Sequence, residues 1–203
     1  MQNQPAKGIS YVFHPLLVPA YTLLLLLNIN NAISLMIPVD YKMILLGIVV
    51  LTTFIFPLFF AFLLYRLHVI SSFFLEQKEE RTYLILGVAI FYYLTYYLLK
   101  GISLSVMFSY YMLGCTILAI LTLIINFYFK ISFHMIGIGS LTGLLLGLSL
   151  KYGLQTDLFL FGSILAGGII GYARLKLNAH HPVEVYTGFF LGVVVISTLI
   201  ILH

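Results

Sequence analysis

A short segment near the end of the chain concentrates side chains that could do chemistry. It runs from Arg174 to Glu184 and includes His180 and His181 ahead of Pro182, a residue suited to the first turn of a helix. His180 and Glu184 are four residues apart, so a helical turn would bring the carboxylate to one imidazole nitrogen. That contact fixes the tautomer and raises the basicity of the other nitrogen, which a nucleophilic or general-base histidine needs. The segment therefore predicts histidine chemistry.

Two earlier segments carry the partners that such chemistry requires. Ser132 and His134 stand where an apolar run begins, and an ionisable side chain just inside a membrane helix is by default a functional hypothesis. Lys78 and Arg81 belong to the most strongly charged run of the chain. With Arg174 they would supply donors suited to a tetrahedral anion, because a guanidinium binds phosphate oxygens through paired hydrogen bonds. These residues predict a phosphate-like substrate.

Membrane helices must position these residues, because the composition excludes a soluble domain. Of the 203 residues, 62% are hydrophobic and 8% are charged, whereas globular proteins average roughly half and about a quarter. The length suits one transmembrane domain, residues 1–203. The single cysteine, Cys115, lies in an apolar run and excludes a disulfide framework. A chain that lies almost wholly in lipid is not expected to bind nucleic acid, and the first residues, which lack a small-residue cleavage site, predict a retained membrane segment.

Seven apolar runs approach the ~20 residues that a transmembrane helix needs. They cover residues 12–29, 43–65, 82–99, 104–129, 131–150, 156–173 and 183–202. The first run is the weakest, because His14, Pro15 and Pro19 interrupt its opening turns. We therefore predict an all-α integral membrane protein, a polytopic bundle of six to seven transmembrane helices.

Alternating spans would sort the polar residues between two sides of the membrane. One side receives the start of the chain and the connections around residues 66–81, 129–131 and 174–182, with most of the basic residues and five of the six histidines. The rules of membrane insertion place Lys and Arg in cytoplasmic loops. They do not explain the histidines, because histidine carries little charge at neutral pH. An active site at this membrane face accounts for both kinds of residue.

The last three spans are rich in glycine, often at the four-residue spacing that lets helix backbones approach closely. These glycines are Gly137, Gly139, Gly143 and Gly147, then Gly162, Gly167, Gly168 and Gly171, then Gly188 and Gly192. We expect the three helices to form a tight core that holds the site residues in a fixed geometry.

At these residues the chain resembles the type 2 phosphatidic acid phosphatase family, the membrane branch of a superfamily that includes vanadium haloperoxidases. The third motif of that family is Ser-Arg, five residues, His, three residues, Asp, and Arg174, His180 and Glu184 match it with glutamate in place of aspartate. The second motif is Pro-Ser-Gly-His, and Ser132 and His134 match its serine and histidine. The resemblance therefore falls on the residues already singled out for their chemistry.

The first motif of the family, Lys, six residues, Arg-Pro, is matched more loosely. Arg81 corresponds to its arginine, Thr82 stands in place of the proline, and Phe74 occupies the lysine position, so Lys78 would have to substitute for that lysine. Further departures are Ile131 and Phe133 for the proline and glycine of the second motif, and Ala173 for the serine of the third. The region of resemblance covers about residues 75–192.

The resemblance implies a metal-independent lipid phosphatase with no cofactor. His180 would attack phosphorus to give a phosphohistidine, His134 would protonate the leaving oxygen, and Glu184 would orient His180. The residues that would stabilise the equatorial oxygens are Arg174, Arg81, Ser132 and Lys78. The substrate would be a phosphomonoester or diphosphate of a lipid, met among the membrane lipids. Analogy with bacterial relatives implies a bacterial inner membrane protein with its site on the periplasmic face.

Two other interpretations stay open from the residues alone. A metal site could use His134, His180, His181 and Glu184, since imidazole and carboxylate also bind Zn²⁺, although adjacent histidines rarely bind one ion together. A non-catalytic protein that binds or transports a lipid phosphate could use the same basic face. No catalytic role is expected for the remaining histidines near this face, which are His14, His68 and His181. Of these, His181 is kept as the alternative to His180, because the two are adjacent.

Overall fold

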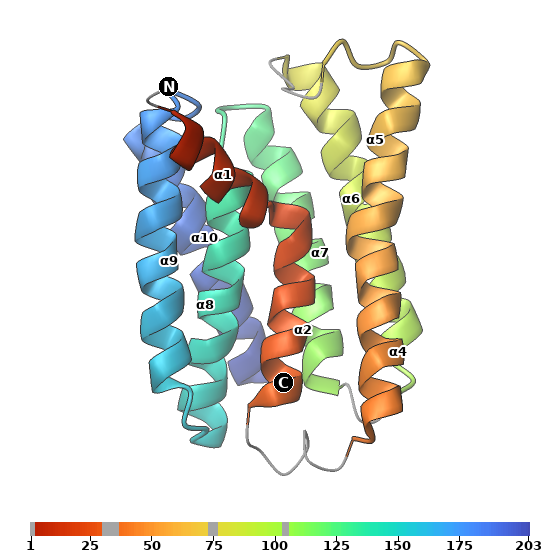
Figure 1. The fold of residues 1–203 in the computed structure, drawn as a ribbon, viewed down its shortest axis with the longest axis vertical. Helices are drawn as coiled ribbons and strands as arrows, with labels where there is room; N and C mark the ends of the chain where they lie inside the picture. Colours follow the sequence, from red (N-terminus) through yellow and green to blue (C-terminus); the bar gives the residue numbers. More distant parts are fainter. Residues whose placement is uncertain (1–2, 30–36, 73–76, 103–105) are drawn as a thin grey trace. The chain divides into compact units, whose positions relative to one another are not determined.

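The computed structural model describes residues 3–29, 37–72, 77–102 and 106–203, which fold almost wholly into α-helices and include no strand (Figure 1). Phe74, the departure in the first motif, lies outside the described residues. Within the described ranges, seven helical segments are long and apolar enough to cross a membrane. They are Gln4–Asn28, Val39–Arg66, Lys78–Leu99, Val106–Asn126, Phe133–Tyr152, Asp157–Lys176 and Pro182–Leu202. The protein is thus an all-α, multi-pass membrane protein, and the predicted fold class is confirmed.

The chain folds as two compact units, and each is described by itself. The terminal unit comprises Met1–Val18 and Phe129–His203, and the central unit comprises Pro19–Tyr128. Both ends of the chain therefore belong to the same unit. That unit also contains the residues that resemble the second and third motifs, whereas Lys78 and Arg81 belong to the central unit.

The central unit contains α2 (Val18–Asn28, apart from its first residue), α4 (Val39–Val50), α5 (Phe56–Arg66), α6 (Lys78–Leu99) and α7 (Val106–Asn126). A π-helical turn, η2 (Leu51–Ile55), joins α4 to α5 just ahead of Pro57, whose ring and missing N–H disturb the regular ladder of hydrogen bonds. Buried hydroxyls link the helices, with Thr95 Oγ1 of α6 donating to Thr52 Oγ1 of η2 at 2.8 Å. Such bonds satisfy polar side chains that lipid could not.

The terminal unit contains α8 (Phe133–Tyr152), α9 (Asp157–Lys176) and α10 (Pro182–Leu202) side by side, with α1 (Gln4–Val12) lying across them in Figure 1. The beginnings of α8 and α10 and the end of α9 share one end of this unit, the end near α1. Ile9 and Phe13 pack against a buried cluster formed by Met135, Ile138, Ile170 and Val185. As predicted, the first apolar run is interrupted near His14, whose side chain caps the short 3-10 helix η1 (Pro15–Leu17) by accepting the N–H of Leu16.

Glycine brings α8 and α10 into backbone contact. A Cβ added to Gly143 would lie 2.6 Å from the carbonyl oxygen of Val193, and one added to Gly188 would lie 2.9 Å from the carbonyl oxygen of Ser132. Gly139, Gly147 and Gly192 meet the facing helix equally closely. The predicted tight core is therefore confirmed for these two helices. For α9 it is wrong in part, because Cβ atoms at Gly162 and Gly168 would meet nothing within 4 Å.

Alanine substitution at two glycines should separate the packed face from the open one. We expect Gly143→Ala to destabilise the protein by about 1–3 kcal/mol, because the added methyl meets backbone that cannot move aside. Gly168→Ala, on an exposed face of α9, should be neutral or stabilise by up to about 1 kcal/mol through helix propensity. Thermal unfolding in detergent measures both variants. Equal melting temperatures for the two would contradict close packing of α8 on α10.

Candidate functional site

The turn between α9 and α10 sets the position of His180. After α9 ends at Lys176, the N–H of Ala179 bonds the carbonyl of Arg174 at 3.2 Å, and Asn178 adopts a left-handed conformation with φ of 50°. Asparagine tolerates that conformation better than most residues. The chain then turns at His181, which is extended and caps α10, with Pro182 at the first helical position. His180 therefore precedes a well-defined helix start.

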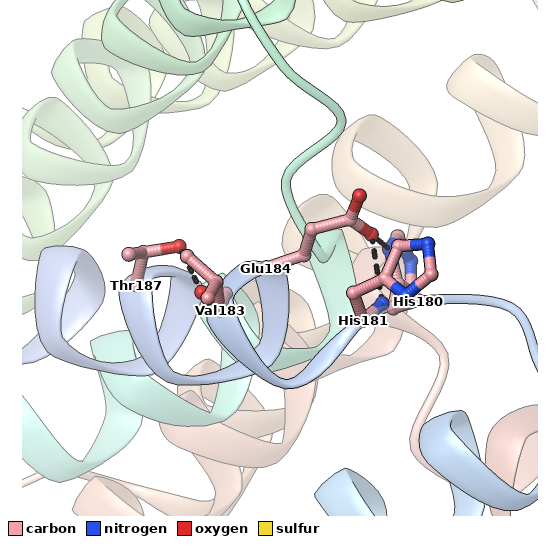
Figure 2. Close-up of polar contacts among 5 residues, drawn as sticks. All are labelled: His180, His181, Val183, Glu184 and Thr187. Carbon is pink, nitrogen blue, oxygen red and sulfur yellow. Dashed lines mark hydrogen bonds and ion pairs between the residues drawn. The ribbon is translucent and has the colours of Figure 1, made fainter.

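Glu184 holds His180 by one ring nitrogen. Its Oε2 lies 2.7 Å from Nδ1 of His180 and also accepts the backbone N–H of His181 at 3.2 Å, as Figure 2 shows. Because the same carboxylate oxygen is tied to the helix cap, its position is set by the backbone. The two side chains are 7% and 14% exposed. A carboxylate only accepts, so Nδ1 carries the proton and Nε2 of a neutral imidazole keeps its lone pair.

The start of α8 is fixed against the start of α10. The N–H of Ser132 bonds the carbonyl of Glu184 at 3.2 Å, and Gly188 lets the two backbones meet there. Ser132 is the N-cap residue of α8, but its hydroxyl makes no capping bond, is fully buried and has no hydrogen-bond partner among the described residues. A buried hydroxyl without a partner is costly in a stable protein. It therefore suits a role in binding a ligand.

His134 and Arg174 lie within reach of the same N-terminal residue. Nε2 of His134 is 3.1 Å from the carbonyl oxygen of Ser10, and Nη1 of Arg174 donates to the Ser10 hydroxyl at 3.3 Å. The buried Nε of Arg174 has no partner in the part of the chain that the structure describes. The His14 ring lies 5.9 Å from that of His134, edge to face. One guanidinium and two further imidazoles thus belong to the unit that holds His180.

The environment of His180 favours its neutral form. Burial lowers the pKa of His180 below its ordinary value of 6.5, and the nearby positive charges of Arg174 and Lys130 lower it further. The hydrogen bond and the negative charge of Glu184 act in the opposite direction. At neutral pH the imidazole is therefore uncharged, which is the form in which Nε2 can attack an electrophile.

This balance of charges predicts how activity depends on pH. Because the pKa of His180 is lowered, its neutral form persists as the pH falls below 6.5, and the acid limb of kcat/KM should lie below that value. Glu184→Gln removes the charge that raises the pKa and should move the limb to lower pH. Lys130→Ala removes a charge that lowers the pKa and should move it to higher pH. Profiles of the three proteins on one substrate test this, since the ionisation of the substrate is common to all. Shifts of the same sign would contradict the assignment.

Lys78 and Arg81 lie at the start of α6 in the central unit. Nζ of Lys78 donates to the carbonyl of Phe127 at 3.4 Å, while Arg81 is 5% exposed. Thr82, in place of the family's proline, donates its hydroxyl to the carbonyl of Lys78, and Asn126 of α7 bonds both residues. The start of α6 is therefore well anchored. The part of Lys78 and Arg81 in phosphate binding stays a prediction.

The central unit also has a polar cleft, lined by residues that include Arg66, His68, Glu79 and Glu80. No residue of its lining was among the predicted site residues. Glu80 is buried there and accepts the backbone N–H of Ser71 at 2.7 Å, so it has a structural task in holding that segment. We assign the chemistry to the histidines of the terminal unit. The cleft is a polar hollow, and none of the hydrogen bonds described for its lining joins a histidine to a carboxylate as His180 is joined to Glu184.

Two residues of the terminal site were missed from the sequence. The sequence indicates no role for Ser10 or for His14, whereas in the structure Ser10 bonds Arg174 and the His14 ring neighbours that of His134. The apolar spacing of Ala6, Ile9 and Phe13 could have indicated a helix whose inner face also carries Ser10. Nothing in the sequence, however, indicates which residues that helix meets.

The geometry of the site bears on the metal interpretation, and comparisons with known proteins bear on the family. Within the described ranges, no group of three or more His, Cys, Asp and Glu side chains is arranged to hold a metal ion. His134, His180, His181 and Glu184 are thus not gathered into such a group among the described residues. Comparisons with protein-family models, with curated proteins and with solved structures find no match to this chain. Its function must therefore be inferred from the site itself.

Proposed function

We propose that this protein is a membrane-embedded lipid phosphatase that hydrolyses a phosphomonoester or diphosphate of a lipid through a phosphohistidine, without a metal. The observation that carries the proposal is the contact of 2.7 Å between Nδ1 of His180 and Glu184, on a histidine whose burial keeps it neutral. A neutral imidazole with one nitrogen fixed by a carboxylate presents the other as a nucleophile. The resemblance to type 2 phosphatidic acid phosphatases assigns the same role to His180.

The proposed reaction has two steps. In the first, the lone pair on Nε2 of His180 forms a bond to phosphorus, the bond from phosphorus to the leaving oxygen of the lipid phosphate or diphosphate breaks, and His134, which starts as the imidazolium, gives a proton to that oxygen. In the second, His134 takes a proton from water, the water oxygen bonds to phosphorus, and the bond from phosphorus to nitrogen breaks. Inorganic phosphate leaves, and both histidines return to their starting states.

Buried donors support the stabilisation of charge on the transferring phosphoryl group. Nε of Arg174 and the hydroxyl of Ser132 are buried without partners among the described residues, so each has a hydrogen-bond donor to offer to an equatorial oxygen. A guanidinium edge binds phosphate in a fixed geometry, which a flexible ammonium does not. The resemblance to the phosphatase family assigns Lys78 and Arg81 to the same task, and that assignment stays a prediction.

The position of the site at helix ends supports a lipid substrate. Arg174 is in the last turn of α9, and Glu184 is in the first turn of α10, both helices long enough to span a membrane. Nearby apolar side chains such as Tyr172, Val183 and Tyr186 are more than 60% exposed, as expected of faces that contact acyl chains. A headgroup could thus reach the donors while its chains stay in the bilayer. By analogy with bacterial members of the phosphatase family that the chain resembles, we propose that the site lies at the periplasmic face of a bacterial inner membrane.

Phosphate release by the purified protein in detergent tests the function. The substrates are phosphatidic acid, phosphatidylglycerol phosphate, a polyprenyl diphosphate and a lipid A phosphate, each assayed with and without EDTA. We expect release from at least one of them, unaffected by the chelator. Binding of these lipids without release would favour the non-catalytic alternative, and release abolished by the chelator would contradict the histidine mechanism.

A further inference from the structure

The N-terminal helix α1 is built into the terminal unit beside the proposed phosphate site. Ala6 is buried, and Ile9 and Phe13 pack on the apolar cluster that α8, α9 and α10 form beneath it. Ser10 lies on the same side of α1, one turn after Ala6. The helix therefore holds Ser10 in a set position against the site.

The hydroxyl of Ser10 accepts a hydrogen bond from Arg174 and has no proton left for a substrate. Its Oγ donates to the carbonyl of Ala6 at 3.1 Å, so its lone pairs receive Nη1 of Arg174 at 3.3 Å. A hydroxyl has one proton to give. Ser10 therefore orients Arg174 and is not itself a donor to phosphate.

The bond to Ser10 uses Nη1 of Arg174, a nitrogen that does not take part when a guanidinium binds phosphate side-on. A guanidinium can bind two oxygens side-on through Nε and Nη2, the edge opposite Nη1. In this structure Nη1 is held by Ser10, while the buried Nε has no partner among the described residues. The guanidinium is thus anchored by one corner with its Nε edge left for an anion.

The backbone of Ser10 contacts a second residue of the site. Its carbonyl oxygen lies 3.1 Å from Nε2 of His134. Because a carbonyl only accepts, Nε2 carries the proton and Nδ1 is left for exchange with the substrate. The carbonyl of Ser10 thus fixes one ring nitrogen of His134, just as the carboxylate of Glu184 fixes one ring nitrogen of His180.

We propose that Ser10 is a positioning residue of the phosphate site, whose hydroxyl fixes the guanidinium of Arg174 so that its Nε edge meets the phosphate oxygens. The inference rests on the proposed function in one respect, namely that the ligand is phosphate. It extends that function to a residue outside the three motifs. It also makes α1 part of the site.

Binding of inorganic phosphate to the purified full chain, measured by titration calorimetry in detergent, tests this role. Ser10→Ala should weaken phosphate binding about tenfold, because Arg174 then loses its anchor. Ser10→Thr keeps the hydroxyl and should restore most of the affinity. The control is Ser197→Ala, which also removes a hydroxyl bonded within its own helix and should change the affinity by less than about twofold.

A double-mutant cycle separates positioning of Arg174 from a general loss of structure. In an Arg174→Ala background, Ser10→Ala should have no further effect on phosphate affinity. An equal effect of Ser10→Ala with and without Arg174, or one no larger than that of Ser197→Ala, would overturn the proposal. Phosphate binding without hydrolysis of any lipid phosphate would overturn the phosphatase and leave the role of Ser10 supported if the cycle holds. A wild-type protein that binds no phosphate would overturn both.

Discussion

His180→Ala should release no phosphate above background from any lipid phosphate that the wild-type protein hydrolyses. Without the imidazole no atom is placed to accept the phosphoryl group, since the carboxylate of Glu184 is tied to the cap of α10. Loss of a nucleophile costs on the order of 10⁴-fold or more in turnover. A radiolabelled lipid phosphate gives two measurements, which are the rate of release and the acid-labile, base-stable phosphoenzyme trapped by quenching. Both should vanish in this variant.

The neighbouring histidine provides the matched control. His181 is exposed, and His181→Asn removes the imidazole while retaining a side chain that can cap α10. This variant should keep activity within about threefold of the wild type, as expected of a surface change that spares the cap. Wild-type turnover in His180→Ala would refute the nucleophile. Loss of activity in His181→Asn alone would move that role to the adjacent residue.

Features fixed by local geometry were predictable from the sequence. The contact of His180 with Glu184 follows from their spacing at the start of a helix, because residues four apart lie on one face whatever surrounds them. The seven spans follow from the lengths of the apolar runs, and the interruption near His14 follows from Pro15 and Pro19. In each case the physical cause lies within one turn or one span of the chain.

Features that depend on which helices meet were harder to predict. Glycine spacing predicted close packing, but the sequence does not tell which glycines face a partner, so Gly143 meets α10 whereas Gly168 meets open space. The contacts of Ser10 join α1 to residues far along the chain, and no periodicity encodes such a meeting. Lys78 and Arg81 were grouped with the histidines through motif order alone, and that grouping stays a prediction.

His134→Ala should distinguish substrates by their leaving groups. A lipid alkoxide is strongly basic and needs a proton as it departs, whereas p-nitrophenolate leaves without one. The loss should therefore be about 10²- to 10⁴-fold on the lipid phosphate and markedly smaller on p-nitrophenyl phosphate. The rate to compare is that of phosphoenzyme formation in a single turnover, because hydrolysis of the phosphohistidine is common to both substrates.

A change in the nucleophile supplies the control for that selectivity. Glu184→Gln weakens the attack by His180, a step that both substrates share, so it should slow phosphoenzyme formation on both by similar factors. The ratio of the two rates should then change in His134→Ala and stay near the wild-type value in Glu184→Gln. Equal losses on both substrates in His134→Ala would show that this histidine does not protonate the leaving oxygen. Its contact with Ser10 would then serve the packing of α1 on α8, and the proton would have to come from another donor of the site, such as His14, whose ring lies 5.9 Å from that of His134.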